Sequence, residues 1–182
     1  MTLDGLTSSG SAEGIDLAGV EGTFTLTGSN NTISATNSAA VYIEGNTTIA
    51  STVTLKSVSA TDSPANSIHI FNTTGSFTVT GDGSTAASGG IIDNATSNGV
   101  DLFNTENVSL SYMNIINGDA HGIFADEMTT LDLTGMAIND NGDVINESGF
   151  RFDHLYGTNT ISDSTFTGNF FAGIFTPALT AR

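Results

Sequence analysis

Cysteine is absent from this chain of 182 residues, and proline and basic residues are rare. Without cysteine there is no disulfide framework, no thiolate metal site and no cysteine nucleophile. No apolar run reaches membrane-spanning length. The first ten residues, "MTLDGLTSSG", have neither the basic region nor the apolar stretch of a signal peptide. We therefore expect no membrane insertion, and either a removed export signal or a chain cut from a longer protein.

Positive charge is scarce as well. The chain has 19 acidic residues against Lys56, Arg151 and Arg182, which gives a formal net charge of −16. Nucleic acids are bound by basic surfaces, so a nucleic-acid partner is excluded, and an anionic membrane surface is disfavoured. The acidity is typical of a surface that must stay soluble. The alternative is that part of it binds calcium.

Strong helix formers such as Lys, Glu and Arg are few, whereas Ser, Thr, Asn and Gly are abundant. This composition favours strands and turns. Glycine aside, only 38% of the residues are hydrophobic. A stable core therefore requires that the apolar residues be placed regularly.

The apolar residues do recur in a fixed pattern. Short alternations of apolar with polar or small residues have the spacing of strands, and they begin at Ile15, Val41, Ile68, Val100, Ile123, Phe150 and Ile174. Successive starts lie 26, 27, 32, 23, 27 and 24 residues apart. A period in this range indicates a solenoid.

Two further strands follow the first in each repeat. The second is marked by Phe24 and Leu26, Val53 and Leu55, Phe77 and Val79, Val108 and Leu110, Leu131 and Leu133, and Ile161. The third, less regular, is marked by Ile33, Val58, Ile91, Met113 with Ile115, Met136 with Ile138, and Phe166. We predict an all-β solenoid of about seven coils and three strands per coil, forming a rod roughly 30–35 Å long. The alternative is a β-sandwich, which usually shows hairpin turns every 8–12 residues or so.

Two segments, "GVDLFNTENVSLSYMNIINGDAHGIF" and "GFRFDHLYGTNTISDSTFTGNFFAGIF", resemble right-handed parallel β-helix repeats of the pectate-lyase-like superfamily. The segment "NTTGSFTVTGDGSTAASGGII" is similar to segments of very large bacterial surface proteins built from such repeats. The resemblance extends from about residue 14 to the end. It implies a single-stranded right-handed parallel β-helix, with residues 1–182 as one domain. It implies no one activity, because the superfamily includes lyases, glycosidases, adhesins and inert stalks.

The repeats vary most at their corners. Insertions occur at "TGDGSTAASGG" and at "NDNGDVINESG", where glycine and Asn or Asp suit tight turns. Asn72 and Asn104 occupy equivalent positions after Phe71 and Phe103. We expect these two asparagines to form a short internal stack that joins adjacent coils. Neither end of the chain has an evident capping segment, so the domain is expected to be a fragment of a longer solenoid or to associate with other copies through its open ends.

The outward residues of the first strands form the most varied column of the chain. We expect Tyr42, His69, Asp101, Phe124, Arg151 and Phe175, together with Asp16, to lie about one strand apart. The resemblance implies that such a surface binds an extended glycan. If the protein is an enzyme, its catalytic residues would be Asp101, Arg151, Asp153 and His154, because glycosidases need paired carboxylates and uronate lyases need a base and a cation. The superfamily's sharper motifs, such as "NTDG", "DD" and "RIK", are missing.

Two other surfaces are candidate sites. In "NDNGDVINE", Asn139, Asp140, Asn141 and Asp143 are candidate calcium ligands, since they supply closely spaced oxygens; the alternative is a turn rich in Asn and Asp. Outward hydroxyls on the second strands resemble the threonine arrays of ice-binding β-helices, although Lys56 and Asp132 interrupt them. Threonine is common at outward strand positions in any case.

The sequence therefore predicts a structural or adhesive β-helix module, located outside the cell or on a bacterial cell surface, with no catalysis and no obligatory cofactor. Its expected partner is a glycan or another cell-surface ligand. The alternative is a carbohydrate-active β-helix that resembles a polysaccharide lyase or a glycoside hydrolase.

Overall fold

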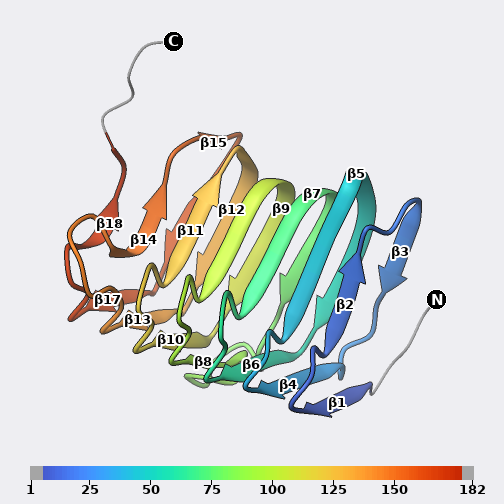
Figure 1. The fold of residues 1–182 in the computed structure, drawn as a ribbon, viewed down its shortest axis with the longest axis horizontal. Helices are drawn as coiled ribbons and strands as arrows, with labels where there is room; N and C mark the ends of the chain where they lie inside the picture. Colours follow the sequence, from blue (N-terminus) through green and yellow to red (C-terminus); the bar gives the residue numbers. More distant parts are fainter. Residues whose placement is uncertain (1–5, 178–182) are drawn as a thin grey trace.

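The computed structural model describes residues 6–177, without the side chains of residues 46–48. Its regular elements are all strands, and no helix, membrane-spanning or otherwise, occurs among the described residues. The strands wind into stacked coils that run from the blue N-terminal end to the red C-terminal end (Figure 1). The predicted β-solenoid is confirmed.

One sheet contains the third strand of every coil, stacked in parallel with consecutive coils side by side. Its strands are β1 (Thr7–Gly10), β4 (Thr32–Thr36), β6 (Ser57–Thr61), β8 (Gly90–Asp93), β10 (Met113–Ile116), β13 (Ala137–Asn139) and β17 (Thr165–Thr167).

The other sheet contains the first and second strands. Its main path follows β2 (Ile15–Ala18), β5 (Val41–Leu55), β7 (Ile68–Val79), β9 (Val100–Ser111), β11 (Ile123–Asp126), β14 (Ser148–Phe152) and β18 (Ala172–Phe175). The second-strand positions of the outer coils are β3 (Thr23–Leu26), β12 (Met128–Thr134), β15 (Leu155–Tyr156) and β16 (Thr160–Ser162). In the central coils the first and second strands are continuous, so β5, β7 and β9 each bend from one side of the solenoid to the next.

The register of the first strands agrees with the prediction from the repeat. Ile123 pairs with Val100 on one side and with Phe150 on the other. The column continues in both directions through the positions Ile15, Val41, Ile68 and Ile174. Since parallel coils place equivalent residues side by side, one alternation per coil is enough to build this apolar column.

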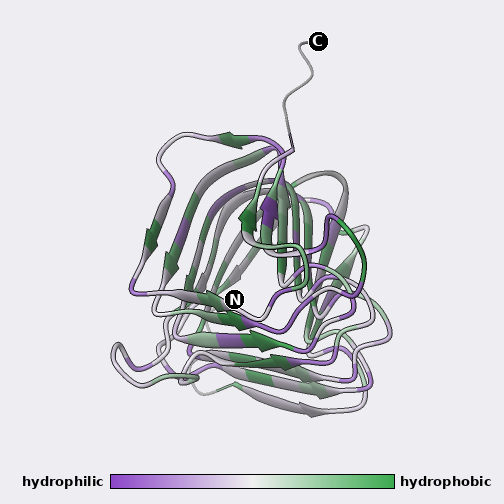
Figure 2. Cartoon of the chain, turned by 90° about the vertical axis from the view of Figure 1, so that its left-hand side faces the viewer, coloured by the Kyte–Doolittle hydropathy of each residue, from purple (hydrophilic) through white to green (hydrophobic). Residues whose placement is uncertain are grey.

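The core fills the space enclosed by the coils, which lie over one another when viewed along the stack (Figure 2). Its members are mostly aliphatic residues and methionines from all three strands, together with two buried phenylalanines, Phe77 at 3% and Phe150 at 1% exposure. Leu102, Leu110 and Met113 are fully buried representatives of the first, second and third strands of one coil. Each interior coil thus has its apolar side covered by the coils above and below.

Two details of the sequence prediction are wrong. Ile91 is 40% exposed, and its neighbour Ile92 points inward, because Gly90 occupies the position that stacks on Met113. In the second strands, Leu26 pairs with Val53 and not with Leu55, because the corner after the first strand is only one residue longer in the second coil than in the first. At the C-terminal end, Ile161 and Ile174 pair as predicted with Leu133 and Phe150 but are 42% and 47% exposed, since no further coil covers them among the described residues.

Both predicted insertions are loops outside the coil. The first lies between β7 and β8, where the Asp82 carboxylate accepts the backbone N–H groups of Ser84 and Thr85 at 2.9 and 2.7 Å. These hydrogen bonds, led by those from Thr85, hold the pKa of Asp82 well below its usual range. The second loop lies between β13 and β14. The parallel pairing of the neighbouring strands continues on both sides of each insertion.

The predicted asparagine stack is present, but it lies at an outer corner and not in the interior. Asn104 Nδ2 donates to Asn72 Oδ1 at 2.9 Å. Both residues have positive φ, 47° and 54°, at the bends of β9 and β7. Asparagine tolerates this left-handed conformation better than most residues do, which explains its place at the bend.

Candidate functional site

The outward side chains of the first strands form the candidate site, called here the first-strand face. Every residue of the predicted column pairs in register with the next, in the order Asp16, Tyr42, His69, Asp101, Phe124, Arg151 and Phe175. The six predicted ligand-binding residues are thus brought together. Their interactions divide the face into an N-terminal and a C-terminal half.

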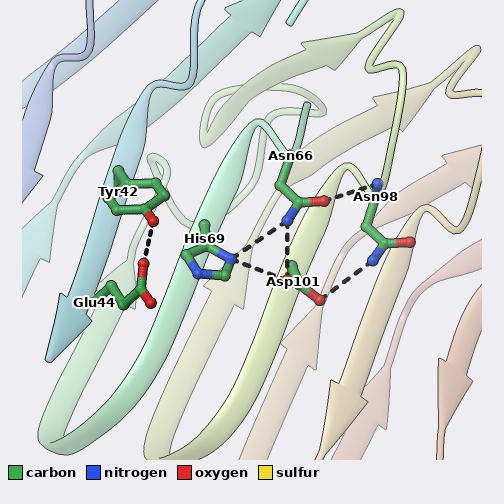
Figure 3. Close-up of polar contacts among 6 residues, drawn as sticks. All are labelled: Tyr42, Glu44, Asn66, His69, Asn98 and Asp101. Atoms are coloured by element: carbon green, nitrogen blue, oxygen red, sulfur yellow. Dashed lines mark hydrogen bonds and ion pairs between the residues drawn. The ribbon is translucent and has the colours of Figure 1, made fainter. Parts of the chain in front are cut away.

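The Asp101 carboxylate, with three polar neighbours, lies in the N-terminal half (Figure 3). Asp101 Oδ2 lies 2.9 Å from both His69 Nδ1 and Asn66 Nδ2, and Asp101 Oδ1 accepts from Asn98 Nδ2 at 3.2 Å. A carboxylate only accepts hydrogen bonds, so His69 Nδ1 donates its proton to Asp101, and the Asn66 amide, 3.3 Å from the same nitrogen, donates to Asp101 instead. The backbone N–H of Asn98 donates to Asn66 Oδ1 at 3.0 Å, which ties the two asparagines together.

Aromatic rings stack along the same half. Tyr42 stacks on His69 with centroids 4.9 Å apart, His69 on Phe71 at 5.7 Å, and Phe71 on Phe103 at 4.6 Å. The Tyr42 hydroxyl donates to the Glu44 carboxylate. This hydrogen bond raises the pKa of Tyr42 above its usual 10, and burial and the charges of Glu44 and Asp16 act in the same direction. The potential at this end of the face is therefore negative.

In the C-terminal half, a single guanidinium lies between two rings. Arg151 Cζ is 5.4 Å from the Phe124 ring centre and 6.0 Å from that of Phe175. Arg151 Nε and Nη2 also donate to the Asp153 carboxylate at 3.2 and 3.3 Å. The guanidinium thus explains how two outward phenylalanines are accommodated on a polar face.

The four predicted catalytic residues do not form one group. Arg151 and Asp153 are paired, whereas His154 Nδ1 contacts Asp126 Oδ1 at 2.7 Å, and the His154 ring stacks on Tyr156. Asp101 belongs to the His69 cluster. The face therefore has two His–Asp pairs, one in each half, with the side chains 14% and 17% exposed in the first and 34% and 21% exposed in the second.

Some residues of the face are not anticipated by the sequence analysis. Phe71 and Phe103 are two positions beyond His69 and Asp101, so the alternation already places them outward. Asn66 and Asn98 each precede a first strand by two residues. Their equal distance from the strand start could have indicated that these two polar side chains lie next to each other in consecutive coils.

A pocket of about 350 Å³ opens at the corner next to Tyr42 and His69. Its other lining residues come from the turns that precede the first strands of three consecutive coils, and they are Glu13, Ser38, Ala39, Pro64, Ala65 and Asn66. This volume is near the lower end of the range for small-molecule sites.

The predicted calcium ligands lie close together in sequence but face different surroundings. Asn141 is fully buried, and its amide accepts from Gly118 N and donates to the carbonyl oxygens of Ile115 and Asn139. Desolvation and the nearby Glu147 carboxylate raise the pKa of Asp143. No group of three or more His, Asp or Glu side chains is arranged around a common metal position in residues 6–177. Calcium binding through Asn139, Asp140, Asn141 and Asp143 stays a prediction.

A comparison with known protein families identifies the chain. A family model described as "Right handed beta helix region" matches residues 13–177. The chain belongs to the right-handed β-helix family. No curated protein and no solved structure matches this β-helix significantly. The resemblance to bacterial adhesins therefore stays a prediction for the β-helix, and its role is argued from its own residues.

Proposed function

We propose that this β-helix is a rigid, non-catalytic module of a bacterial extracellular or cell-surface protein, and that its first-strand face binds a glycan. The observation that carries the proposal is the first-strand column, which runs in register through every coil. It presents one continuous row of aromatic and polar side chains on a stiff support.

Rigidity is supported by the hydrogen bonding between coils. Equivalent strands pair in parallel along the stack, and side chains at the corners add further bonds from coil to coil, such as Asn104 to Asn72. Opening one coil would break backbone bonds on both sides and expose part of the apolar core. Stability of this kind is shared among neighbouring repeats.

Binding is supported by the chemistry of the face. Aromatic rings lie beside carboxylate and amide groups whose positions are set by hydrogen bonds, as in the cluster of His69, Asn66 and Asp101. Sugars offer apolar ring surfaces and many hydroxyl groups, which match rings and fixed polar groups. The net charge of −16 opposes strongly acidic polymers and favours neutral or cationic ones.

The test is a glycan array followed by titration of any binding oligosaccharide. Phe103→Ala and Arg151→Ala should weaken binding at least about tenfold, equivalent to about 1.4 kcal/mol. Thr78→Ala, on the outward side of the second strand, is the matched control and should bind like the parent chain. If no glycan binds, or if Thr78→Ala weakens binding as much, the proposed face is wrong.

A second function, carbohydrate cleavage, is favoured by one observation. Asp126 contacts His154 Nδ1, which leaves His154 Nε2 to exchange a proton with a substrate, and the paired Arg151 and Asp153 lie on the same half of the face. Reducing ends and unsaturated products should be assayed with the parent chain and with His154→Gln. Turnover that this variant abolishes would make the β-helix an enzyme, whereas binding without turnover supports the non-catalytic module.

A further inference from the structure

The pocket beside Tyr42 has an aromatic wall and an ordered rim. Tyr42 and His69 supply the aromatic side and stack on one another, and His69 is held through its Nδ1 atom by Asp101. Ala39, Pro64 and Ala65 supply an apolar side. A ligand of one ring can therefore meet both apolar surface and oriented polar groups.

Hydrogen bonds between coils hold the turns around the pocket. Ser63 Oγ donates to the Ser38 carbonyl oxygen at 2.7 Å, and Ala40 N donates to the Ser67 carbonyl oxygen at 2.8 Å. Asn66 is tied on one side to Asp101 and on the other to Asn98. Because the rim is already ordered, little conformational entropy would be lost on binding.

The pocket also lies in an acidic environment. Glu13 is one of its lining residues, and Asp16 and Glu44 are close enough to Tyr42 for their charges to raise the pKa of its hydroxyl. Lys56 and Arg151 are the only lysine and arginine in the described residues, and neither lines the pocket. Carboxylates without a neighbouring cation favour a positively charged ligand, and aromatic rings add to this preference.

We propose that this pocket binds one amino-sugar residue of a glycan, with its ammonium group near the Glu13 carboxylate and its ring against the Tyr42 and His69 wall. The inference rests on the proposed function and specifies its ligand as a glycan with free amino groups. N-acetylation removes the charge, and a uronate reverses it, so both modifications should weaken binding.

The probes are three oligosaccharides of matched length: a glucosamine trimer, an N-acetylglucosamine trimer and a galacturonate trimer. Calorimetric titration should show the glucosamine trimer binding at least about tenfold more tightly than the N-acetylated one, a difference of about 1.4 kcal/mol. The galacturonate trimer should bind most weakly. Added salt should reduce the preference for the amine, because the interaction is between opposite charges.

Three variants separate the pocket from the overall charge. Glu13→Gln should remove the preference for the amine, and Ala65→Phe, at an exposed rim position, should block the pocket. Glu106→Gln makes the same change of charge at an exposed position outside the pocket and should leave the preference intact. Circular dichroism and melting temperature verify that each variant is folded.

The outcomes distinguish this inference from the proposed function. Equal binding of the amino and N-acetylated trimers, or an equal effect of Glu13→Gln and Glu106→Gln, overturns the amino-sugar site but leaves a glycan-binding face intact. If no glycan of any charge binds, the proposed function fails together with the pocket assignment.

Discussion

The backbone N–H of Ser148 donates to His121 Nδ1 at 3.0 Å, so an imidazole ring joins two consecutive coils. His121 is only 7% exposed. His121 also continues the row of polar side chains at this corner, because its backbone N–H donates to Asn98 Oδ1 at 3.3 Å. Since Nδ1 accepts a hydrogen bond, the buried ring must be neutral, with its proton on Nε2.

This arrangement predicts that stability depends on pH. Burial, with a smaller contribution from the charge of Arg151, lowers the pKa of His121 below its ordinary value of 6.5. The unfolded chain then binds a proton at a higher pH than the folded chain does. The free energy contributed by neutral His121 is fully present above about pH 6.5 and decreases as pH falls toward the folded pKa. Denaturant unfolding at several pH values between about 7.5 and 5 measures this, above the range where most carboxylates titrate.

His121→Asn is the control for that prediction. An asparagine side chain can accept the Ser148 N–H, as Asn98 accepts that of His121, without titrating. Relative to this variant, the parent chain should lose stability as pH falls, and His121→Ala should cost about 1–3 kcal/mol at neutral pH because a buried N–H loses its acceptor. Identical pH profiles for the parent chain and His121→Asn would show that His121 is not the titrating group.

Alanine substitutions at Gly90, in β8, and at Gly83, in the loop before it, should differ in their effect on stability. Both have positive φ, 109° and 86°, but a Cβ at Gly90 would lie 1.9 Å from the Val58 carbonyl oxygen, whereas one at Gly83 has nothing within 4 Å. We expect Gly83→Ala to cost about 1–2 kcal/mol from backbone strain alone. Gly90→Ala should cost more than about 4 kcal/mol or prevent folding. Equal melting temperatures for the two variants would contradict the close packing of β8 on β6.

The asparagine pair at the outer corner predicts that glycine is a better replacement than alanine. Asn104→Gly loses the hydrogen bond to Asn72 but keeps the positive φ without strain. Asn104→Ala loses both and should be about 1 kcal/mol less stable than the glycine variant. Unfolding free energies in urea measure the difference, and a more stable alanine variant would refute the role of backbone conformation at this bend.

Ile123 and Ile174 occupy the same apolar column but differ in how far neighbouring coils bury their side chains. Ile123 is fully buried between two coils, whereas Ile174 is 47% exposed in the last one. Ile123→Ala should cost about 2–5 kcal/mol, and Ile174→Ala about 1 kcal/mol or less. Chemical denaturation of both variants tests whether the apolar column is the main source of stability, and similar losses would argue against it.

The contact between Arg151 and Phe124 predicts a measurable coupling. A double-mutant cycle with Arg151→Met and Phe124→Leu should give an interaction energy of about 0.5–1 kcal/mol, the range for a partly exposed cation over a ring. Arg151→Lys should recover only part of it, because an ammonium lacks the planar guanidinium. An additive cycle would mean that the two side chains are neighbours without interacting.

The repeat made the first-strand column predictable. Equivalent residues pair in parallel coils, so the order from Tyr42 to Phe175 follows once each strand start is located. Corner geometry was less predictable, because it depends on how many residues each bend contains. Ile92, and not Ile91, points inward for that reason, since Gly90 follows a loop whose exit the periodicity does not determine.

The polar partners of the site were the least predictable feature. The strand alternation places His69 and Asp101 on the face but does not indicate that Asn66 and Asn98 hold the carboxylate between them. Nor does it indicate the role of His121, although this residue precedes a first strand by two positions, as Asn66 and Asn98 do. Such contacts depend on side-chain direction at a corner, where neither strand alternation nor helix periodicity applies.

The loop between β7 and β8 begins and ends at glycines whose amides bond to neighbouring coils: Gly81 N to the Lys56 carbonyl oxygen and Gly89 N to that of Tyr112. The residues between Gly81 and Gly89 form a loop outside the coils of the β-helix. Foreign peptides of different lengths could replace residues 82–88 while the rise from coil to coil stays the same. This loop is therefore an insertion site whose sequence and length can vary, by evolution or by engineering, independently of the β-helix.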